Sequence, residues 1–397
     1  MKIDTDVSKI DQLLTRGVEN IYPNKDFLKD VLKSGKQLTL YTGYDPTSPT
    51  LHIGHGITML KLREFQELGH KVIMLIGDFT GMIGDPTDKL SARKQLTREQ
   101  VLENCKEYQK QASSVLSFEG KNPVEVKYNS EWLSKLSFSD LIELSSHFTV
   151  QQMLERDMFQ KRLEEEKPVF MHEFMYPMMQ GYDSVAMNVD GEVGGNDQTF
   201  NMLAGRDLMS ELKGKNKFVL TTKLLVDSSG AKMGKTTGNA VSLDQTPEDM
   251  FGKAMSWGDD MIVKGLEICT RMDISEIKKI EKELEKGGNP RDFKLVLAYE
   301  VVKTFLGDEA AKKGKEYFIN TFSKKEIPTD IPEITPSKYD IITVLTESKI
   351  CKSTSEARQN ITQGGVKINE EKVTDIKSEV KKGDVVQKGS RFFVKIN

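Results

Sequence analysis

The chain has 397 residues and a net charge of −3, which allows two or three domains with full cores and does not by itself indicate a nucleic-acid-binding protein. Its longest apolar stretch, residues 72–76, is too short to cross a membrane, and its first residues lack the features of a signal peptide. Its three cysteines are far apart and form no CxxC motif, which favours reduced cytoplasmic thiols over a disulfide framework or a structural metal site.

The first elements along the chain predict an α/β fold. Residues 1–35 have apolar side chains at helical spacing. Residues 37–42 and 71–76 are strand-like runs that flank a helical pattern over 56–68, which makes a βαβ unit. This alternation predicts a Rossmann-like, doubly wound parallel sheet, whose ligands bind at the carboxyl ends of the strands. Further strand candidates are residues 124–128, 217–220 and 224–226.

The second part of the chain is predominantly helical and charged. Residues 275–286 and 291–306 have the clearest helical patterns, and Pro290 separates them. Three prolines between residues 327 and 336 predict an extended linker. Beyond the linker, two helices and two strands predict a small α+β module, and these elements are residues 341–345, 353–359, 366–369 and 392–396.

Charge is distributed unevenly between these parts. From Lys338 onward there are twelve Lys and Arg residues against eight Asp and Glu residues, so the tail is basic and the rest of the chain is acidic. A basic tail fits contact with RNA, although an ordinary solvated surface explains the charge alone equally well.

Two histidines, His52 and His55, open the predicted helix 56–68 after an Asp45-Pro46-Thr47 turn. Imidazoles three residues apart at a helix start face the same way, and the free N–H groups there attract phosphate. Gly54 between them leaves room for a flat adenine and ribose against the backbone. Taken alone, the pair is explained better as structural histidines that cap a helix.

Four further segments carry chemistry-bearing side chains. Lys232 and Lys235 follow a turn at residues 227–230 and could grip a triphosphate, although in isolation a basic surface turn is the simpler interpretation. Gly195 and Asp197 belong to a glycine-rich segment that alone is a common loop. Tyr176, Gln180 and Asp183 have the i, i+4, i+7 spacing of one helical face, and Pro177 predicts that this helix begins there. An amphipathic core helix with an exposed Asp183 explains the spacing equally well.

Together these segments resemble the class I aminoacyl-tRNA synthetases. Residues 52–55 and 232–236 are similar to the HIGH and KMSKS signatures of that class, with Gly234 and Thr236 in place of the two serines. Residues 180–183 and 194–198 resemble the tyrosyl-tRNA synthetases specifically, and the basic tail resembles an S4-type RNA-binding module. The resemblance implies a tyrosine–tRNA ligase that uses ATP as a substrate with Mg²⁺ and holds no metal of its own.

The resemblance also implies residue roles. His52 and His55 would stabilise charge at the α-phosphate and pyrophosphate, and Lys232 and Lys235 would grip the β- and γ-phosphates. Thr47 would lie near the reacting carboxylate. The implied ATP-binding residues are Asp45, Gly54, Gly195, Asp197 and Lys235.

For the amino acid, the resemblance implies that Asp183 and Tyr41 read the phenol hydroxyl of tyrosine. A site built around such a hydroxyl rejects phenylalanine by a factor on the order of 10⁵ without editing. The other implied tyrosine-binding residues are Asp85, Tyr176 and Gln180 at the amino group and Gln198 at the carboxylate.

We therefore expect a catalytic domain over 1–245, a helical tRNA-binding domain over 246–326, a linker over 327–337 and an S4-like domain over 338–397. The expected partners are tRNA(Tyr), L-tyrosine and ATP, in a cytoplasmic homodimer with no membrane contact. The alternatives are a tryptophanyl-tRNA synthetase, another HxGH nucleotidyltransferase that makes a small metabolite, and a non-catalytic RNA-binding relative. The tail and the residues Tyr41 and Asp183 disfavour the first two, and the intact histidines and lysines disfavour the third.

Overall fold

The computed structural model of the chain describes residues 2–87, 95–226, 241–323, 331–389 and 392–397. Two compact units make up the chain, Met1–Ala311 and Lys312–Asn397. Within the described ranges, no helix is long and apolar enough to cross a membrane.

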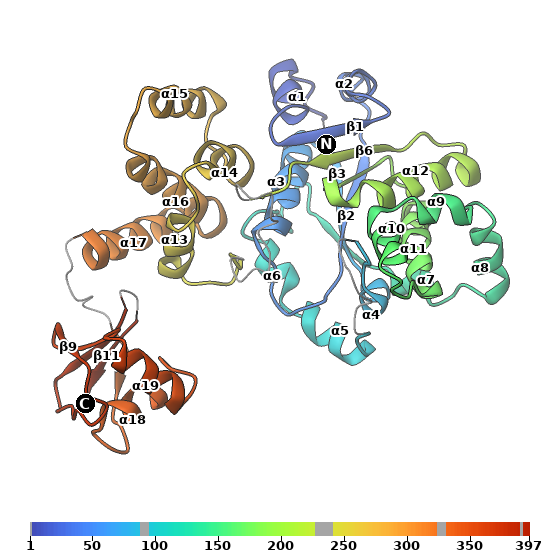
Figure 1. Cartoon of the computed structure of the whole chain (residues 1–397). Helices are drawn as coiled ribbons and strands as arrows, with labels where there is room; N and C mark the ends of the chain where they lie inside the picture. The colour runs from blue at the N-terminus through green and yellow to red at the C-terminus, as the bar shows by residue number, and fades with distance from the viewer. Residues whose placement is uncertain (1, 88–94, 227–240, 324–330, 390–391) are drawn as a thin grey trace. The chain divides into compact units, whose positions relative to one another are not determined.

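A six-stranded sheet in the order β1-β6-β5-β2-β3-β4 forms the centre of the first unit (Figure 1). Five of its strands are parallel, and β1 pairs antiparallel with β6 at one edge. Every residue of β3 after Lys71 is apolar and buried, as expected for an inner parallel strand covered on both faces. The strands are β1 (Val18–Tyr22), β2 (Thr39–Tyr44), β3 (Lys71–Ile76), β4 (Glu125–Tyr128), β5 (Gly191–Gly195) and β6 (Phe218–Thr222).

Helices cover both faces of this sheet, as two glycines of β5 on opposite faces show. On one face, a Cβ on Gly191 would lie 2.1 Å from the ring of Phe218, which stacks on Phe65 of α3 (Ile53–Glu67). On the other face, a Cβ on Gly194 would lie 2.8 Å from the sulfur of Met202 in α12 (Thr199–Lys213). The two glycines therefore allow helices to approach the sheet closely from opposite sides.

The remaining helices of the sheet region precede β1, follow it, lie in the long connection between β3 and β5, or, in the case of η1, directly follow β5. They are α1 (Val7–Leu13), α2 (Lys25–Lys33), α4 (Thr80–Ile83), α5 (Arg98–Cys105), α6 (Tyr108–Ala112), α7 (Ser130–Leu133), α8 (Phe138–Ser145), α9 (Val150–Leu154), α10 (Asp157–Glu164), α11 (Met171–Met187) and the 3₁₀ turn η1 (Asn196–Gln198).

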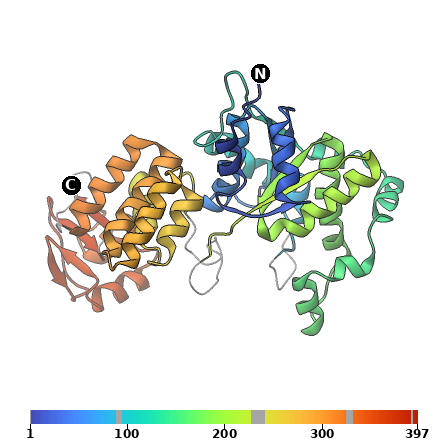
Figure 2. The ribbon, with the colours of Figure 1, turned by 90° about the horizontal axis from the view of Figure 1, so that it is seen from above.

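The helices that follow the sheet gather into a bundle (Figure 2). Pro290 occupies the first turn of α16, where its missing N–H costs nothing. Phe305 of α16 packs against α3 at Gly56, where a Cβ would lie only 2.5 Å from its ring. The bundle helices are α13 (Pro247–Met255), α14 (Met261–Cys269), α15 (Ile274–Glu285), α16 (Pro290–Leu306) and α17 (Asp308–Phe318), and the π-helical turn η3 (Ile319–Ser323) follows them.

The second unit contains a five-stranded sheet in the order β7-β11-β10-β8-β9 with two helices packed on its apolar residues. β7 pairs parallel with β11, so the end of the proline-rich segment joins this sheet. The elements are β7 (Glu333–Ile334), α18 (Ile341–Glu347), α19 (Thr354–Thr362), β8 (Val366–Ile368), β9 (Glu371–Val373), β10 (Val385–Lys388) and β11 (Phe392–Ile396).

Three predictions about elements were wrong. Residues 1–35 are not helical throughout, because β1 separates α1 from α2 and extends the sheet beyond β6. Residues 224–226 form no strand. Pro177 does not open its helix, since α11 begins six residues earlier and contains the proline in its interior.

Candidate functional site

The predicted site residues converge on the carboxyl ends of β2 and β5. The chain runs outward from β2 to β3 and β4 and then returns to the other side of β2 as β5 and β6, so the strand order reverses between β2 and β5. Such a reversal opens a crevice at the strand ends, which is the usual ligand site of a doubly wound sheet. Asp45 directly follows β2, and Gly195 and Asp197 end β5 and follow it.

Asp45 joins three segments of the site. Its carboxylate accepts hydrogen bonds from the hydroxyl of Thr80 at 2.7 Å and from the phenol of Tyr176 at 2.7 Å. A Cβ on Gly77, after β3, would lie 2.0 Å from Asp45 Oδ1, so only glycine fits beside this carboxylate. Tyr176 thus contacts a residue predicted to bind ATP rather than one predicted to bind tyrosine. Thr47 lies two residues on, exposed in the same turn, and its N–H donates to the Asp45 carbonyl at 2.7 Å.

His52 and His55 form the start of α3. His52 is the N-cap residue and accepts the Gly54 N–H at its Nδ1, and the Nδ1 of His55 accepts the N–H of His52. The two rings stack with centroids 3.9 Å apart. Because each Nδ1 accepts a hydrogen bond, the neutral form of each ring carries its proton on Nε2. Both imidazoles are therefore hydrogen-bond donors at Nε2, as contact with a phosphate requires.

Gly54 is fitted to this arrangement. A Cβ there would lie 2.9 Å from Cε1 and 3.0 Å from Nδ1 of His52, so a side chain at this position would displace the imidazole. The glycine therefore leaves space for the His52 imidazole, and it also leaves the backbone open to close approach by adenine and ribose.

Lys232 and Lys235 lie outside the described residues. The segment directly after theirs pairs with the histidine segment, since Ile53 N donates to the Val241 carbonyl at 2.8 Å and Leu243 N donates to the Leu51 carbonyl at 2.9 Å. The chain therefore returns from the two lysines beside the start of α3.

Asp183 of α11 is buried, with 2% of its surface exposed, which removes the alternative of an exposed Asp on an amphipathic helix. Trp132 Nε1 donates to its carboxylate at 2.7 Å, and Asn129 Nδ2 donates at 3.3 Å. Burial raises the pKa of Asp183 well above its ordinary value, and these two donors oppose that shift. A carboxylate held in this way favours a ligand that brings a further proton donor.

Tyr41 and Gln180 make a second set of contacts, with Ser184 and Glu192. The hydroxyl of Tyr41 lies 2.9 Å from Ser184 Oγ, and the Gln180 amide donates to the Glu192 carboxylate at 3.0 Å. Tyr41 is fully buried, and burial followed by the charges of Glu192 and Asp183 raises its pKa well above the ordinary value. Its hydroxyl therefore remains protonated and able to donate.

Asp85 and Gln198 contact each other, because Gln198 Nε2 donates to Asp85 Oδ2 at 2.7 Å. The hydroxyl of Thr87 donates to the other Asp85 oxygen at 2.7 Å and accepts from Arg156 at 2.7 Å. Gln198 ends the short helical turn after β5, so these contacts connect the end of β5 to the segment after α4.

Sequence reasoning missed four side chains that hold this site, namely Asn129, Trp132, Glu192 and Lys217. Asn129 directly follows a predicted strand, and that position was a signal for the same sheet edge as Asp45. Glu192 and Lys217 gave no such signal, because their strands were not delimited correctly from the sequence.

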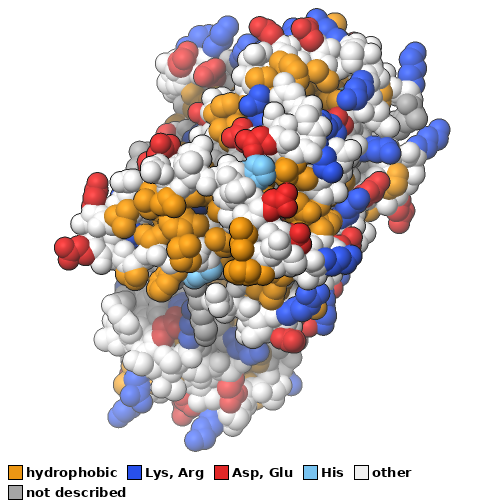
Figure 3. Space-filling model, turned by 90° about the vertical axis from the view of Figure 1, so that its right-hand side faces the viewer, with side chains coloured by type: hydrophobic (Ala, Val, Ile, Leu, Met, Phe, Trp, Pro, Cys, Tyr) orange, Lys and Arg blue, Asp and Glu red, His pale blue; other side chains and the backbone are white. Residues whose placement is uncertain are grey.

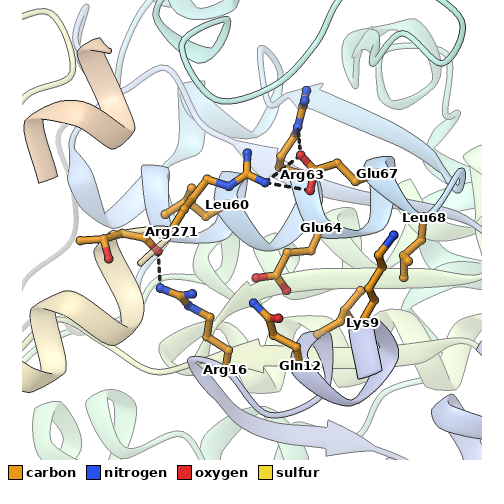
Figure 4. Close-up of a pocket in the computed structure, with 11 residues that line it drawn as sticks. Lys9, Gln12, Arg16, Leu60, Arg63, Glu64, Glu67, Leu68 and Arg271 are labelled. Carbon is orange, nitrogen blue, oxygen red and sulfur yellow. Dashed lines mark hydrogen bonds and ion pairs between the residues drawn. The ribbon is translucent and has the colours of Figure 1, made fainter. Parts of the chain in front are cut away.

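A polar cavity of about 260 Å³ lies elsewhere, between α1, α3 and the end of α14 (Figure 4). None of the predicted site residues lines it. Its charged side chains are partnered within the protein, as Arg63 and Arg271 are with Glu67. The charged lining residues are Lys9, Arg16, Arg63, Glu64, Glu67 and Arg271.

Two protein-family models match the chain. Residues 33–323 match the class I tRNA synthetases for tryptophan and tyrosine, and residues 322–394 match a tyrosine–tRNA ligase C-terminal domain.

Individual relatives agree with these matches. The chain is 42% identical to the tyrosine–tRNA ligase of Haemophilus influenzae over 99% of this chain and 98% of the relative. It is also 42% identical to the tyrosine–tRNA ligase of Thermotoga maritima, over 97% and 96% of the two chains. The fold is similar to that of a truncated mitochondrial tyrosyl-tRNA synthetase from Aspergillus nidulans, with a TM-score of 0.67, 24% identity and coverage of 79% and 94%.

Proposed function

The chain belongs to the tyrosine–tRNA ligase family of class I synthetases, and from this premise we propose how its residues perform the reaction. The enzyme activates L-tyrosine with ATP to give tyrosyl-adenylate and pyrophosphate, and then transfers tyrosine to the 3′ end of tRNA(Tyr). The tyrosine carboxylate is the nucleophile of the first step, so the protein supplies positioning and charge stabilisation rather than a covalent group.

In the first step, His52 and His55 donate from Nε2 to the phosphate oxygens that gain charge as the α-phosphate is attacked. The stacking of the rings and the hydrogen bonds at both Nδ1 atoms support this role, because they hold the two Nε2 donors in place before the substrate binds. Lys232 and Lys235, which lie outside the described residues, complete the phosphate contacts. Magnesium enters with ATP, and among the described residues no group of three His, Cys, Asp or Glu side chains is arranged to hold a metal.

Asp45, Gly54, Gly195 and Asp197 bind the nucleoside of ATP at the strand reversal, and Thr47 lies near the reacting carboxylate. In this arrangement Asp197 accepts the ribose hydroxyls, while Gly54 and Gly195 let the backbone approach adenine and ribose.

The amino acid binds beside α11. Asp183 accepts a hydrogen bond from the substrate phenol, Tyr41 donates one to the phenol oxygen, and Gln180 accepts one from the α-ammonium group. Tyr176 and Asp85 complete the ammonium site, and Gln198 contacts the carboxylate. The observation that carries this assignment is the buried carboxylate of Asp183 with its two fixed donors.

Calorimetric titration without ATP tests the amino-acid site directly. We expect tyrosine to bind at least about 1,000-fold more tightly than phenylalanine, because phenylalanine leaves Asp183 without the phenol proton. Comparable affinity for the two amino acids, or stronger binding of tryptophan, would contradict the assignment of Asp183.

We further propose a homodimer, formed through an apolar face at α8 to α11. Figure 3 shows apolar side chains gathered on the side of the molecule that carries these helices. In the single chain these large apolar residues are highly exposed, at 79% for Phe138 and 70% for Met171. Such an exposed apolar patch is typical of a surface that a partner subunit covers. The other members are Ile142, Val150, Leu163 and Phe170.

Sedimentation velocity on the variant Met171→Glu tests the dimer. A charge at the centre of an apolar contact is expected to shift the protein from dimer to monomer at micromolar concentration. The matched change Glu166→Gln, at an exposed position before α11, should leave the dimer intact. A monomeric wild-type protein would contradict the proposal.

For the tRNA we propose a catalytic domain over 1–245, a helical anticodon-binding domain over 246–326 and a C-terminal S4-like domain. β7 (Glu333–Ile334), inside the linker predicted over 327–337, already belongs to the sheet of that S4-like domain. One tRNA spans both subunits of the dimer. We place the reaction in the cytoplasm, where reducing conditions keep the buried cysteines free, and these are Cys105, Cys269 and Cys351.

A further inference from the structure

A buried ion pair lies behind the tyrosine-binding side chains. Lys217, directly before β6, and Glu192 of β5 have side-chain exposures of 0% and 2%, and the Lys217 ammonium donates to the Glu192 carboxylate. Removing two charges from water offsets much of their attraction, so a buried pair is weak evidence for added stability. Its contacts indicate a different purpose.

Both members of the pair contact side chains of the site. Lys217 Nζ donates to Ser184 Oγ at 2.7 Å, and that oxygen lies 2.9 Å from the Tyr41 hydroxyl. Glu192 accepts the amide N–H of Gln180 at 3.0 Å with its other oxygen. The pair is thus connected to Tyr41 on one side and to Gln180 on the other.

The packing of α12 makes room for this arrangement. A Cβ on Gly205 would lie 2.7 Å from Lys217 Nζ and 3.0 Å from Ser184 Oγ, so glycine is what lets the ammonium reach Ser184. Burial lowers the pKa of Lys217, and the adjacent Glu192 carboxylate opposes this shift and favours the charged form.

Each contact fixes the direction of the next hydrogen bond. An ammonium group only donates, so Ser184 Oγ accepts from Lys217 and its own proton is available to the Tyr41 oxygen. The Tyr41 hydroxyl points its own proton away from Ser184, toward the Gln180 backbone carbonyl at 3.4 Å. A carboxylate only accepts, so Gln180 must turn its NH₂ toward Glu192 and its carbonyl oxygen the other way.

We propose that Lys217 and Glu192 are positioning residues that fix Tyr41 as a donor to the substrate phenol oxygen and Gln180 as an acceptor for the substrate ammonium. This inference rests on the proposed roles of Tyr41 and Gln180 in tyrosine binding. It assigns the two ends of the pair to two different parts of the amino acid, which makes them separable by experiment.

Two variants, Ser184→Ala and Glu192→Gln, test the Lys217 end and the Glu192 end of the ion pair separately. Ser184→Ala cuts the connection from Lys217 to Tyr41 and leaves the ion pair in place. Glu192→Gln keeps the shape but lets an amide donate toward Gln180, which reverses the amide of Gln180. Glu64→Gln is the matched control, because it removes a carboxylate from the ion pair of Lys61, 2.6 Å away on α3, without contact to the site.

The measurement is ATP–pyrophosphate exchange with tyrosine and phenylalanine, with KM determined for each amino acid and for ATP. For Ser184→Ala we expect the preference in kcat/KM for tyrosine over phenylalanine to fall about tenfold, since the lost contact concerns the phenol alone. For Glu192→Gln we expect KM to rise about tenfold for both amino acids, since both carry the ammonium. KM for ATP should stay at the wild-type value in both variants and in Glu64→Gln.

The inference is overturned if Ser184→Ala keeps the wild-type preference, or if Glu192→Gln raises KM for ATP as much as KM for tyrosine. Ser184→Ala tests it even where Glu192→Gln fails to fold, because a buried serine tolerates loss of its hydroxyl better than a buried pair tolerates loss of one charge. Failure of the proposed function is distinct, because it would appear as a wild-type enzyme without preference for tyrosine.

Discussion

At the scale of single residues, we propose that the first step depends on two imidazoles whose donor atoms are fixed by the backbone. The hydrogen bonds at Nδ1 of His52 and His55 leave Nε2 of each ring as the donor, and the stacked rings restrict their rotation. Preorganised donors of this kind act on the transition state because no rearrangement is needed when charge develops.

Replacing His55 by Ala is therefore expected to lower kcat of tyrosine-dependent pyrophosphate exchange by about 100- to 1,000-fold, with little change in KM for tyrosine. The variant should bind tRNA with the affinity of the wild type, which a filter-binding assay can establish. Exchange at the wild-type rate would show that His55 has no part in the chemistry.

Asp183 illustrates a conflict between stability and function. Its pKa is raised well above 3.8 by burial, so the folded protein disfavours the ionised form. The carboxyl thus contributes to stability at pH values below 3.8, and that contribution is lost as the pH rises through the folded-state pKa.

Asp183→Asn should remove the destabilisation that comes from burying an ionised carboxylate. Near pH 8 we expect a higher Tm than for the wild type, with the difference narrowing as the pH is lowered, while kcat/KM for tyrosine falls by at least about 100-fold. Thermal denaturation at several pH values and the exchange assay measure the two effects. A lower Tm at pH 8 would mean that Trp132 and Asn129 stabilise the ionised carboxylate more than burial destabilises it.

The sequence predicted the residues that form the edge of the site and missed the side chains behind them. Asp45 and His52 follow a recognisable strand and open a recognisable helix, so their neighbourhood was predictable. Lys217 and Glu192 come together only because β5 and β6 pair, with Glu192 opposite Val219. Pairing between distant strands leaves no local pattern, so the ion pair could not be predicted.

At the scale of elements, Arg16 is one of the residues that attach the helical bundle to the sheet region. Arg16, 7% exposed after α1, donates four hydrogen bonds to backbone carbonyls at the end of α14 and just beyond it. Carbonyls at a helix end have no partners within the helix, so one guanidinium satisfies several of them at once. The acceptors are the carbonyls of Leu266, Glu267, Thr270 and Met272.

Arg16→Met should therefore lower the free energy of unfolding by about 2–4 kcal/mol, because buried carbonyls lose their donors. Urea denaturation measures the change. Arg63→Met is the control, since its ion pair with the half-exposed Glu67 lies near the surface and should be worth less than about 1 kcal/mol. Equal effects of the two changes would contradict the role given to Arg16.

Element predictions succeeded where a periodic pattern was long and failed where neighbours decided the structure. β3 and α16 were predicted almost to the residue, because an apolar run and a proline mark them. β5 was not, because its glycines suit a turn in isolation and are required here by Phe218 and Met202. The helix start predicted at Pro177 was wrong, because the ion pair between Glu173 and Arg162, 2.7 Å long, supports an earlier start.

At the scale of the whole molecule, chemistry and tRNA recognition are expected to be separable. The second unit has a sheet and an apolar core of its own, so its removal leaves the residues around Asp45 and Asp183 intact. β7 pairs with β11, so a clean deletion begins at residue 331 rather than 338.

Deleting residues 331–397 should leave tyrosine-dependent exchange within about twofold of the full-length rate and lower kcat/KM for charging of tRNA(Tyr) by at least about 100-fold, because basic contacts to the RNA are lost. Aminoacylation with labelled tyrosine measures this. Charging at the full-length rate would show that the C-terminal module does not bind the tRNA.

We propose that this chain selects tyrosine through Asp183 and activates it at the strand reversal. ATP–pyrophosphate exchange with the purified full-length protein, without tRNA, compares tyrosine, phenylalanine and tryptophan in one assay. We expect exchange with tyrosine and none measurable with the other two amino acids at equal concentration. Exchange with tryptophan would contradict the role of Asp183, and no exchange with any of the three would contradict the assignment of His52 and His55 to catalysis.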